Sequence, residues 1–261
     1  MTFNFLLFME KEFYLQYASV EDKHWWFVAR RQILQQVINK INLPKNAQIL
    51  EAGCGTGGNL QMLSRYGQVS AMELDEIACQ LANQRQVTQV KRGSLPDNIP
   101  FNSNYDLIVI LDVIEHLDND LSALESLYYK LKPGGYLLVT VPAYMFLWSE
   151  HDEINHHKRR YRLKGLKQVV KKAGYKVNHG SYFNTILFPL IVVARSLSKL
   201  LPKQNQNQNQ SKNKNSSDLT VPLKSVNQIL KWLFACERYF INRFSLPFGV
   251  SILLLAKKPY S

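Results

Sequence analysis

A cluster of glycines directly after a short apolar run constrains the fold of this chain more than any other feature. Residues 48–50 read as a buried strand, and Glu51 is followed by glycines at positions 53, 55, 57 and 58. Glycines let the backbone turn sharply and approach a ligand that a Cβ atom would push away. A second predicted strand, residues 69–73, ends in Glu73, at the spacing typical of a carboxylate that binds ribose hydroxyls. Together the two elements predict a bound adenosine-type cofactor.

The same glycines also satisfy the dinucleotide pattern G-x-G-x-x-G, which is weak evidence when it stands alone. Glu51 would face the pyrophosphate of a dinucleotide, whereas it suits a cationic amino-acid group. Residues 105–111 read as a buried parallel strand that leads into Asp112-Val-Ile-Glu-His116. Residues 131–142 contain Leu-Lys-Pro-Gly-Gly and predict a helix end, a turn and another buried strand. These features favour a cofactor with an amino-acid moiety over NAD.

The ordered motifs E-x-G-x-G-x-G, an acidic strand end, D-V-x-E-H and L-K-P-G-G resemble class I S-adenosylmethionine-dependent methyltransferases over residues 49–174. The resemblance implies S-adenosyl-L-methionine as the cofactor. It also implies an α/β fold: a Rossmann-like, doubly wound, mostly parallel seven-stranded sheet with an antiparallel last-strand hairpin. Ser94 stands where the family usually has Asp or Asn. The cofactor-binding residues implied in this region are Glu51, Gly53, Cys54, Gly55, Gly57, Glu73, Leu74, Ser94, Leu95, Leu111, Asp112 and His116.

The N-terminal segment carries a second resemblance. Its run His24-Trp-Trp-Phe-Val-Ala-Arg-Arg31 opens a predicted helix that ends near residue 41. It is similar to a bacterial type 11/12-like methyltransferase subgroup that begins with H-W-W-F-x-x-R-R and later shows W-x-x-H-D-x-x-x-H-H-x-R-R-Y. The resemblance implies a helical lid over residues 1–43, with Trp26 and Arg30 near the cofactor. A hydrophobic cap on the domain core is the alternative.

The segment after Pro142 is dense in aromatic, imidazole and guanidinium groups. It follows the carboxyl end of a parallel strand, where open α/β sheets place their ligands. We expect His151 to act as a general base on the acceptor, with Asp152 and His116 as further catalytic residues. The residues expected to bind the acceptor are Tyr144, Trp148, His156, His157, Arg159 and Arg160.

A metal site is a further possibility suggested by the sequence, because His151, Asp152, His156 and His157 lie close together in the chain. Five positions separate His151 from His156, so one helical face does not present both side chains as well as an i, i+4 pair would. No cysteine lies nearby, and no H-E-x-x-H motif occurs. We therefore expect no metal ion.

The C-terminal half predicts an insertion into the sheet. Residues 183–201 and 226–244 read as apolar helices on either side of a Gln-Asn-rich flexible linker, residues 203–218. Residues 175–182 and 251–256 read as strands. The predicted methyltransferase domain is therefore residues 44–183 and 246–261, interrupted by a helical insertion at 184–245. The inserted helices could pack on the domain, roof an apolar acceptor pocket or lie on a membrane surface.

Charge is unevenly distributed along the chain. The formal net charge is +12, and residues 151–261 hold 20 Lys and Arg against 4 Asp and Glu. Such an excess indicates an anionic partner, or simply a solvated basic surface. We expect a small-molecule or lipid-like acceptor, with peripheral contact to an anionic membrane as a further option. No RNA-binding module is recognisable, so nucleic acid is the less favoured partner.

Cysteine use and reaction chemistry narrow the function further. Three cysteines without C-x-x-C spacing predict a reduced, cytoplasmic protein, peripheral at the inner face of the membrane if it binds one. No D/N-P-P-Y motif follows the fourth strand. The expected acceptor atom is O or C, with N as an option. The alternatives are an RNA methyltransferase and a non-catalytic S-adenosylmethionine-binding protein; monomer and homodimer both remain open.

Overall fold

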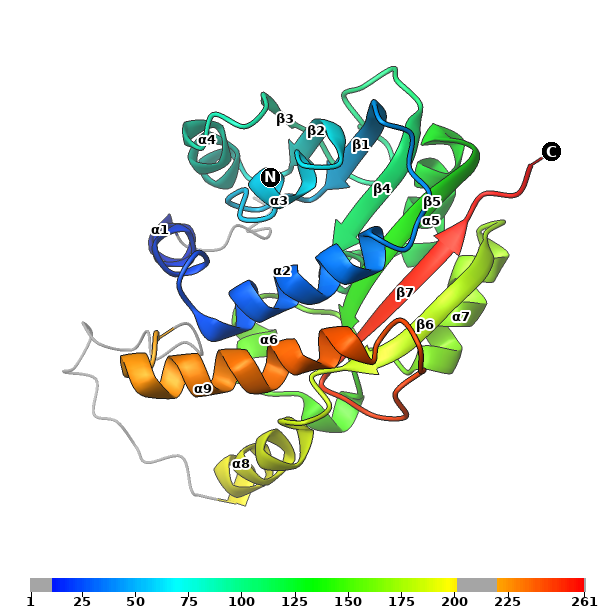
Figure 1. The fold of residues 1–261 in the computed structure, drawn as a ribbon. Helices are drawn as coiled ribbons and strands as arrows, with labels where there is room; N and C mark the ends of the chain where they lie inside the picture. The colour runs from blue at the N-terminus through cyan, green and yellow to red at the C-terminus, as the bar shows by residue number, and fades with distance from the viewer. Residues whose placement is uncertain (1–10, 201–219, 261) are drawn as a thin grey trace, which may run out of the picture.

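The computed structural model describes residues 11–200 and 220–260, so the predicted linker at 203–218 lies outside the described residues. One seven-stranded sheet runs through the molecule in the order β3-β2-β1-β4-β5-β7-β6 (Figure 1). β7 is antiparallel to both of its neighbours, and the other pairings are parallel. The strands are β1 Ala47–Ala52, β2 Gly67–Glu73, β3 Val90–Arg92, β4 Tyr105–Leu111, β5 Leu131–Pro142, β6 Lys176–Phe183 and β7 Ser251–Lys257.

This topology confirms the predicted Rossmann-like fold with its antiparallel last-strand hairpin. The strands are apolar because helices cover both faces of the sheet. The helices are α1 Lys11–Val20, α2 Trp25–Ile38, α3 Leu60–Leu63, α4 Glu76–Gln84, α5 Asp120–Lys130, α6 Glu150–Ile154, α7 Leu163–Lys172, α8 Phe188–Leu200 and α9 Lys224–Ala235. Short 3-10 turns are η1 Ile114–His116, η2 Met145–Leu147 and η3 Cys236–Tyr239.

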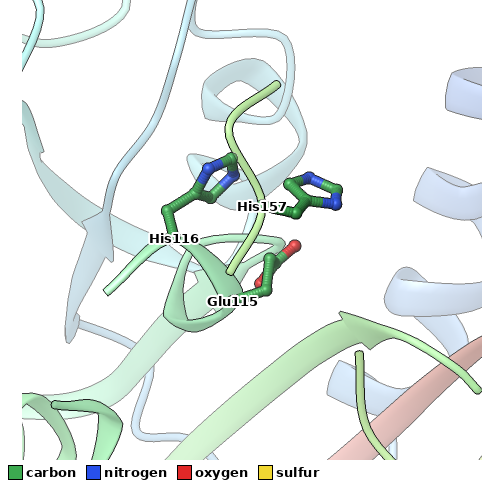
Figure 2. Close-up of side chains that lie close together, drawn as sticks. All are labelled: Glu115, His116 and His157. Carbon is green, nitrogen blue, oxygen red and sulfur yellow. The ribbon is translucent and has the colours of Figure 1, made fainter. Parts of the chain in front are cut away.

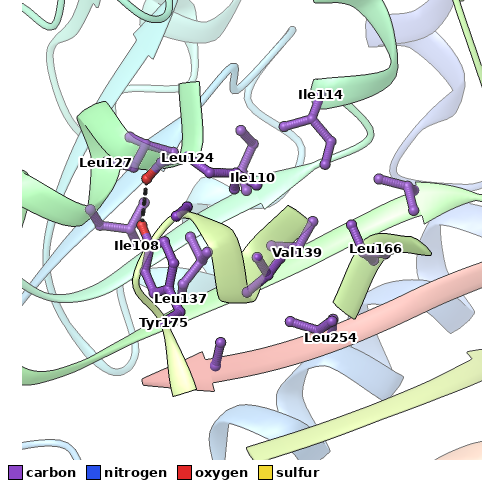
Figure 3. Close-up of a cluster of buried hydrophobic side chains, with 14 of the residues drawn as sticks. Ile108, Ile110, Ile114, Leu124, Leu127, Leu137, Val139, Leu166, Tyr175 and Leu254 are labelled. Carbon is purple, nitrogen blue, oxygen red and sulfur yellow. Dashed lines mark hydrogen bonds between the residues drawn. The ribbon is translucent and has the colours of Figure 1, made fainter. Parts of the chain in front are cut away.

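One face of the sheet packs against α5 and α7. Branched side chains of β4, β5 and β7 meet Leu124, Leu127 and Leu166 in a fully buried cluster (Figure 3). The Tyr175 hydroxyl donates to the Leu124 carbonyl at 2.8 Å, which satisfies a buried polar group inside this cluster. This core fixes β4 and β5, whose carboxyl ends carry the site.

The opposite face packs against α2 and α9, which lie side by side. Phe234 of α9 stacks on Phe183 of β6 with ring centroids 5.9 Å apart, and both rings are buried. Asn227 of α9 accepts from the Trp25 backbone at 2.9 Å and donates to the Lys23 carbonyl at 2.9 Å. One side of α9 therefore packs on the domain, as the core-facing alternative predicts.

The inserted helices are shorter than the sequence predicts. The chain turns at Asn184, which has a positive φ of 57°, before α8 begins. α9 ends at Ala235, and the buried Glu237 carboxylate in the following turn accepts from the backbone amides of Thr185 and Ile186 at 2.6 and 2.9 Å. The apolar pattern beyond Ala235 belongs to η3 and irregular chain. No helix within the described ranges is long and apolar enough to cross a membrane.

Strand order places the functional loops. β1 lies between β2 and β4, so the connections that follow β1 and β4 leave the sheet in opposite directions. A crevice forms at such a switch point, outside the carboxyl ends of the strands. The glycine-rich loop follows β1, Glu73 ends β2, and Asp112 directly follows β4. Three predicted motifs are thereby brought to one edge of the sheet.

Candidate active site

A cavity of about 940 Å³ lies at this edge, between the sheet, the N-terminal helices and α8. Most of the predicted cofactor and acceptor residues line it. Six do not: Glu51, Gly57, Tyr144, Trp148, Asp152 and Arg159. The predicted residues in the lining are Trp26, Arg30, Gly53, Cys54, Gly55, Glu73, Leu74, Ser94, Leu95, Leu111, Asp112, His116, His151, His156, His157 and Arg160.

The glycine-rich loop needs its glycines for two different reasons. Gly53 has a φ of 79°, and a Cβ there would lie 2.6 Å from Val113 Cγ2. Gly55 has a φ of 54°, yet a Cβ there would meet no atom within 4 Å. The space over Gly55 belongs to the cavity. A ligand can therefore approach this backbone closely.

Glu73 closes the loop from the end of β2. One carboxylate oxygen accepts from the Gly55 amide at 2.8 Å, and the other accepts from the Leu74 and Asp75 amides at 2.8 and 3.1 Å. Burial raises the pKa of Glu73 above its ordinary value, although these backbone hydrogen bonds oppose the rise. Each oxygen has two lone pairs, so Oε1 is fully used and Oε2 keeps capacity for one hydroxyl donor of a ligand.

Glu51 lies beneath the loop and is fully buried. Its Oε1 accepts from Asn59 Nδ2 at 2.9 Å, whereas its Oε2 has no hydrogen-bond partner. Burial raises the pKa of Glu51 to about 8. A buried acid with an unpaired oxygen is costly unless a proton or a cation accompanies it.

Arg30 connects α2 to the strand ends. Its guanidinium forms an ion pair with Asp112 and stacks over the Trp26 ring, with its central carbon 4.5 Å from the ring centroid. Thr140 donates to the other Asp112 oxygen at 3.1 Å. Asp112 has a positive φ of 55°, which turns the chain sharply after β4. Trp26, Arg30 and Asp112 thus form one connected wall of the cavity.

Sequence reasoning missed the connection between the first two helices and the glycine loop. Glu21, in the α1–α2 turn, accepts from the Thr56 hydroxyl at 2.6 Å and pairs at 2.5 Å with Arg85, which directly follows α4. Tyr14 and Tyr17 of α1 also line the cavity. No motif marks these residues, because the recognisable H-W-W-F run begins only at His24.

η1 supplies a second set of cavity-lining residues. Glu115 is fully buried, and neither of its carboxylate oxygens has a hydrogen-bond partner. Burial, followed by the charge of Asp112, raises the pKa of Glu115 well above its ordinary value. Burial and the neighbouring His157 lower the pKa of His116 to about 4, so this imidazole is neutral near pH 7. The two imidazole rings meet edge to face at 4.7 Å.

Asp152 acts behind the cavity wall. It is fully buried and receives Arg160 through two hydrogen bonds of 2.7 and 2.8 Å. His157 Nδ1 lies 2.8 Å from Asp152 Oδ1. Although burial alone would raise the pKa of Asp152, the hydrogen bonds from His157 and Arg160 hold it below its ordinary range. Asp152 therefore fixes two cavity side chains and does not itself face the cavity.

Three residues predicted to bind the acceptor lie outside the cavity lining. The Tyr144 ring stacks on Tyr182 at 5.0 Å with an interplanar angle of 8°. Arg159 donates to the carbonyls of Leu117 and Asp118, each at 2.9 Å. Trp148 is half-buried outside the lining. The structure instead adds Ile191, Ala194 and Arg195 of α8, along with Thr220 and Pro222, to the lining.

Comparison with known proteins agrees with the fold and the motifs. A family model described as a methyltransferase domain matches residues 26–179. A Mycolicibacterium smegmatis protein named "Probable S-adenosylmethionine-dependent methyltransferase" is 24% identical over 163 residues, covering 61% of this chain and 62% of that protein. The trans-aconitate 2-methyltransferase of Deinococcus radiodurans is 30% identical over 115 residues, covering 42% of this chain and 41% of the relative.

Phosphoethanolamine N-methyltransferase 2 of Haemonchus contortus, solved in complex with S-adenosyl-L-methionine, shares the fold. Its TM-score is 0.54 at 17% identity, with 87% of this chain and 52% of that chain covered. The fold and its motifs define a Rossmann-like methyltransferase architecture. Since the family model spans more than half of the chain, the chain belongs to the methyltransferase domain family. It covers less than two thirds of the length of either curated relative described above.

Proposed function

We propose that this protein transfers a methyl group from S-adenosyl-L-methionine to an oxygen, carbon or nitrogen atom of a small or lipid-like acceptor. The observation that carries the proposal is the open space over Gly55, bounded by the Glu73 carboxylate, at the switch point of the sheet. A nucleoside fits this arrangement because a ribose hydroxyl can donate to Glu73 Oε2 while the rest of the nucleoside fills the open space over Gly55. Family membership supports the same donor.

The remaining donor contacts follow from the lining. Leu74, Ser94 and Leu95 would flank the adenine, because they lie beside Glu73 and after β3. The amino-acid end would lie toward Glu51, Asp112 and Arg30. The unpaired Glu51 oxygen suits the donor's ammonium group, and the Arg30 guanidinium suits its carboxylate.

Methyl transfer from a sulfonium requires the acceptor atom to be aligned with the methyl group and water to be excluded. It does not require a nucleophilic side chain of the enzyme. The sulfonium supplies an electrophilic methyl group; the carbon–sulfur bond breaks as the acceptor atom takes that carbon. The acceptor proton passes to a base. His116 is neutral near pH 7. His116 of η1 and His151 of α6 both line the part of the cavity that we assign to the acceptor, here called the acceptor half. We assign the base to this pair, with His151 as the first choice.

Positive charge in the acceptor half favours an anionic acceptor. Lys158, Arg160 and Arg195 line the cavity; Lys158 pairs with the exposed Asp118, Arg160 pairs with the buried Asp152, and Arg195 donates to the Leu147 carbonyl. A relative named for methylation of trans-aconitate, a small polyanion, is consistent with such an acceptor. We propose a small acceptor with at least one carboxylate or phosphate group.

We further propose that the inserted helices let the protein contact an anionic membrane, so that a lipid-like acceptor could enter beside α8. Ile191 and Ala194 face the cavity, whereas Leu190, Val193 and Leu197 of the same helix are exposed. On α9, Ile229 and Trp232 are exposed, with side chains open to solvent by 58% and 65%. Exposed apolar helix faces bordered by basic residues bind anionic bilayers.

Ligand-dependent melting tests the donor assignment. S-adenosylhomocysteine should raise the melting temperature of the purified protein by several degrees, and NADH should leave it unchanged. The opposite pattern would reject the assignment. Incubation of cell extracts with methyl-labelled donor, followed by separation into lipid and aqueous fractions, then identifies the acceptor class.

Flotation on liposomes tests the membrane proposal. The protein should float with vesicles of phosphatidylglycerol and phosphatidylcholine, and a Trp232→Ser, Leu190→Ser double variant should float at least several-fold less. Tyr129→Ser is the matched control, because Tyr129 is equally exposed but lies on α5, on the other face of the sheet. Equal flotation of all three proteins would refute the assigned surface.

A further inference from the structure

Three side chains of metal-binding type meet in the acceptor half of the cavity (Figure 2). Glu115 and His116 come from η1, which follows β4, and His157 comes from the segment after α6. One ligand atom from each lies within 4.8 Å of the other two. All three residues line the cavity. Elements far apart in the sequence therefore bring two imidazoles and one carboxylate to a single point.

Glu115 is a buried acid that needs a proton or a cation beside it. Its side chain is fully buried, and neither carboxylate oxygen receives a hydrogen bond. Arg30 and Arg160 are the nearest guanidinium groups, but they bond to Asp112 and Asp152. An ionised carboxylate left unpaired in a protein interior costs several kcal/mol. A cation bound between Glu115 and the imidazoles would remove that cost.

The Asp152 carboxylate fixes the ring orientation and tautomer of His157 in the way that a metal ligand requires. Its Nδ1 is 2.8 Å from the buried Asp152 carboxylate, which fixes the proton on Nδ1 and leaves Nε2 as the electron-pair donor. Histidines that bind metals usually donate their other ring nitrogen to a carboxylate in this way. The backbone carbonyls of Asp112 and Asn155 face His116 and can orient its ring similarly.

We propose that Glu115, His116 and His157 bind a divalent transition-metal ion, with Zn²⁺ as the best fit, and leave one coordination position open to the cavity. Two imidazoles and one carboxylate are a donor set of catalytic zinc sites, whereas Mg²⁺ and Ca²⁺ prefer oxygen ligands. In a tetrahedral site with bonds of about 2.1 Å, ligand atoms lie about 3.4 Å apart. The ligand atoms, now within 4.8 Å of one another, would close by up to about 1.4 Å when the ion binds.

This ligand set differs from the histidine cluster considered in the sequence. Asp152 is committed to Arg160 and His157, so it supports the site from behind. The open position would take an oxygen atom of the acceptor, and this role rests on the proposed function. A coordinated hydroxyl would have a lowered pKa; it would pass its proton to His151, the base proposed above, and its oxygen would take the methyl group as the donor's carbon–sulfur bond breaks. The binding site itself does not depend on that role.

Titration calorimetry with ZnCl₂ on chelator-treated, dialysed protein tests the site. The wild type should bind close to one Zn²⁺ per chain. Glu115→Gln and His157→Gln should each bind at least about tenfold more weakly, as expected when one ligand of three is lost. His179→Gln is the matched control, because His179 is a partly buried imidazole of β6 outside the cavity. Circular dichroism and melting temperature establish that each variant is folded.

Two further readouts separate the metal site from methyl transfer. Co²⁺ should give visible d–d absorption in the wild type and in His179→Gln, but not in Glu115→Gln. S-adenosylhomocysteine should bind the zinc-free protein unchanged, because the donor contacts proposed above do not include Glu115, His116 or His157. The metal site is overturned if folded wild-type protein does not bind Zn²⁺, or if both ligand variants bind it as tightly as the wild type does. Either result leaves the methyltransferase proposal standing. Zn²⁺ binding without S-adenosylhomocysteine binding would support the metal site and reject the donor assignment.

Discussion

Replacing Glu51 with Gln should stabilise the protein in a pH-dependent way. The pKa of this buried acid rises from an ordinary 4.5 to about 8 in the folded state. The folded protein therefore keeps a proton that the unfolded chain releases above pH 4.5, and stability falls as the pH rises from 4.5 to 8. Each pH unit in this window corresponds to about 1.4 kcal/mol. Between pH 5 and pH 8 the wild type should lose up to ~4 kcal/mol from this group.

Glu51→Gln removes this dependence while preserving the side chain's shape. The Gln oxygen can still accept from Asn59 Nδ2, which donates to Glu51 Oε1 at 2.9 Å in the wild type. Urea unfolding followed by tryptophan fluorescence at pH 5, 6.5 and 8 measures the free energy of unfolding. The advantage of Gln over Glu should grow with pH by a few kcal/mol. An advantage that is constant across the three pH values would refute the buried-acid argument.

Donor binding gives the same substitution a second readout. If Glu51 pairs with the donor's ammonium group, S-adenosylhomocysteine should bind the wild type more tightly as the pH rises from 6 to 8, because ionised Glu51 is then more abundant. Glu51→Gln should lose this increase. The same pH slope in both proteins would contradict the place assigned to the ammonium group.

Three further perturbations have defined outcomes. Glu73→Ala should weaken S-adenosylhomocysteine binding by about 10-fold to 100-fold in calorimetry, because hydrogen bonds to a charged group are lost; Glu76→Ala, an exposed neighbour, should leave affinity unchanged. Asp152→Ala should lower the free energy of unfolding by about 3–5 kcal/mol in urea, because it leaves Arg160 buried and unpaired, and a loss below 1 kcal/mol would contradict the clamp. Leu254→Ala, in the fully buried cluster, should cost about 2–5 kcal/mol, whereas the exposed Leu223→Ala should cost little.

The sheet and its loops were predictable because their signals are local. Continuous apolar runs mark β4 and β7, which are buried on both faces, and glycines mark the turn after β1. The position of Glu73 followed from its distance along the chain after Gly53. Strand ends of a parallel sheet meet at one edge, so these local signals also located the cavity.

Tertiary contacts that no local pattern encodes were not predictable. Glu21 reaches the glycine loop only because α1 packs near α4. Tyr144 lies in an aromatic-rich segment, yet its ring stacks on Tyr182 and does not line the cavity. Glu115 and His157 lie about 40 positions apart, and η1 and the clamp on Asp152 bring them together. The sequence prediction of no metal ion rested on histidines that are close neighbours in the chain. It therefore did not include the combination of Glu115 with His157.

The central claim is that a sulfonium nucleoside binds over the glycine loop with its ribose on Glu73. A crystal structure of the protein with S-adenosylhomocysteine tests it most directly. The account predicts density for the nucleoside in the cavity, with a ribose hydroxyl within hydrogen-bond distance of Glu73 Oε2. An empty cavity at saturating ligand, or a ribose bound elsewhere, would contradict it.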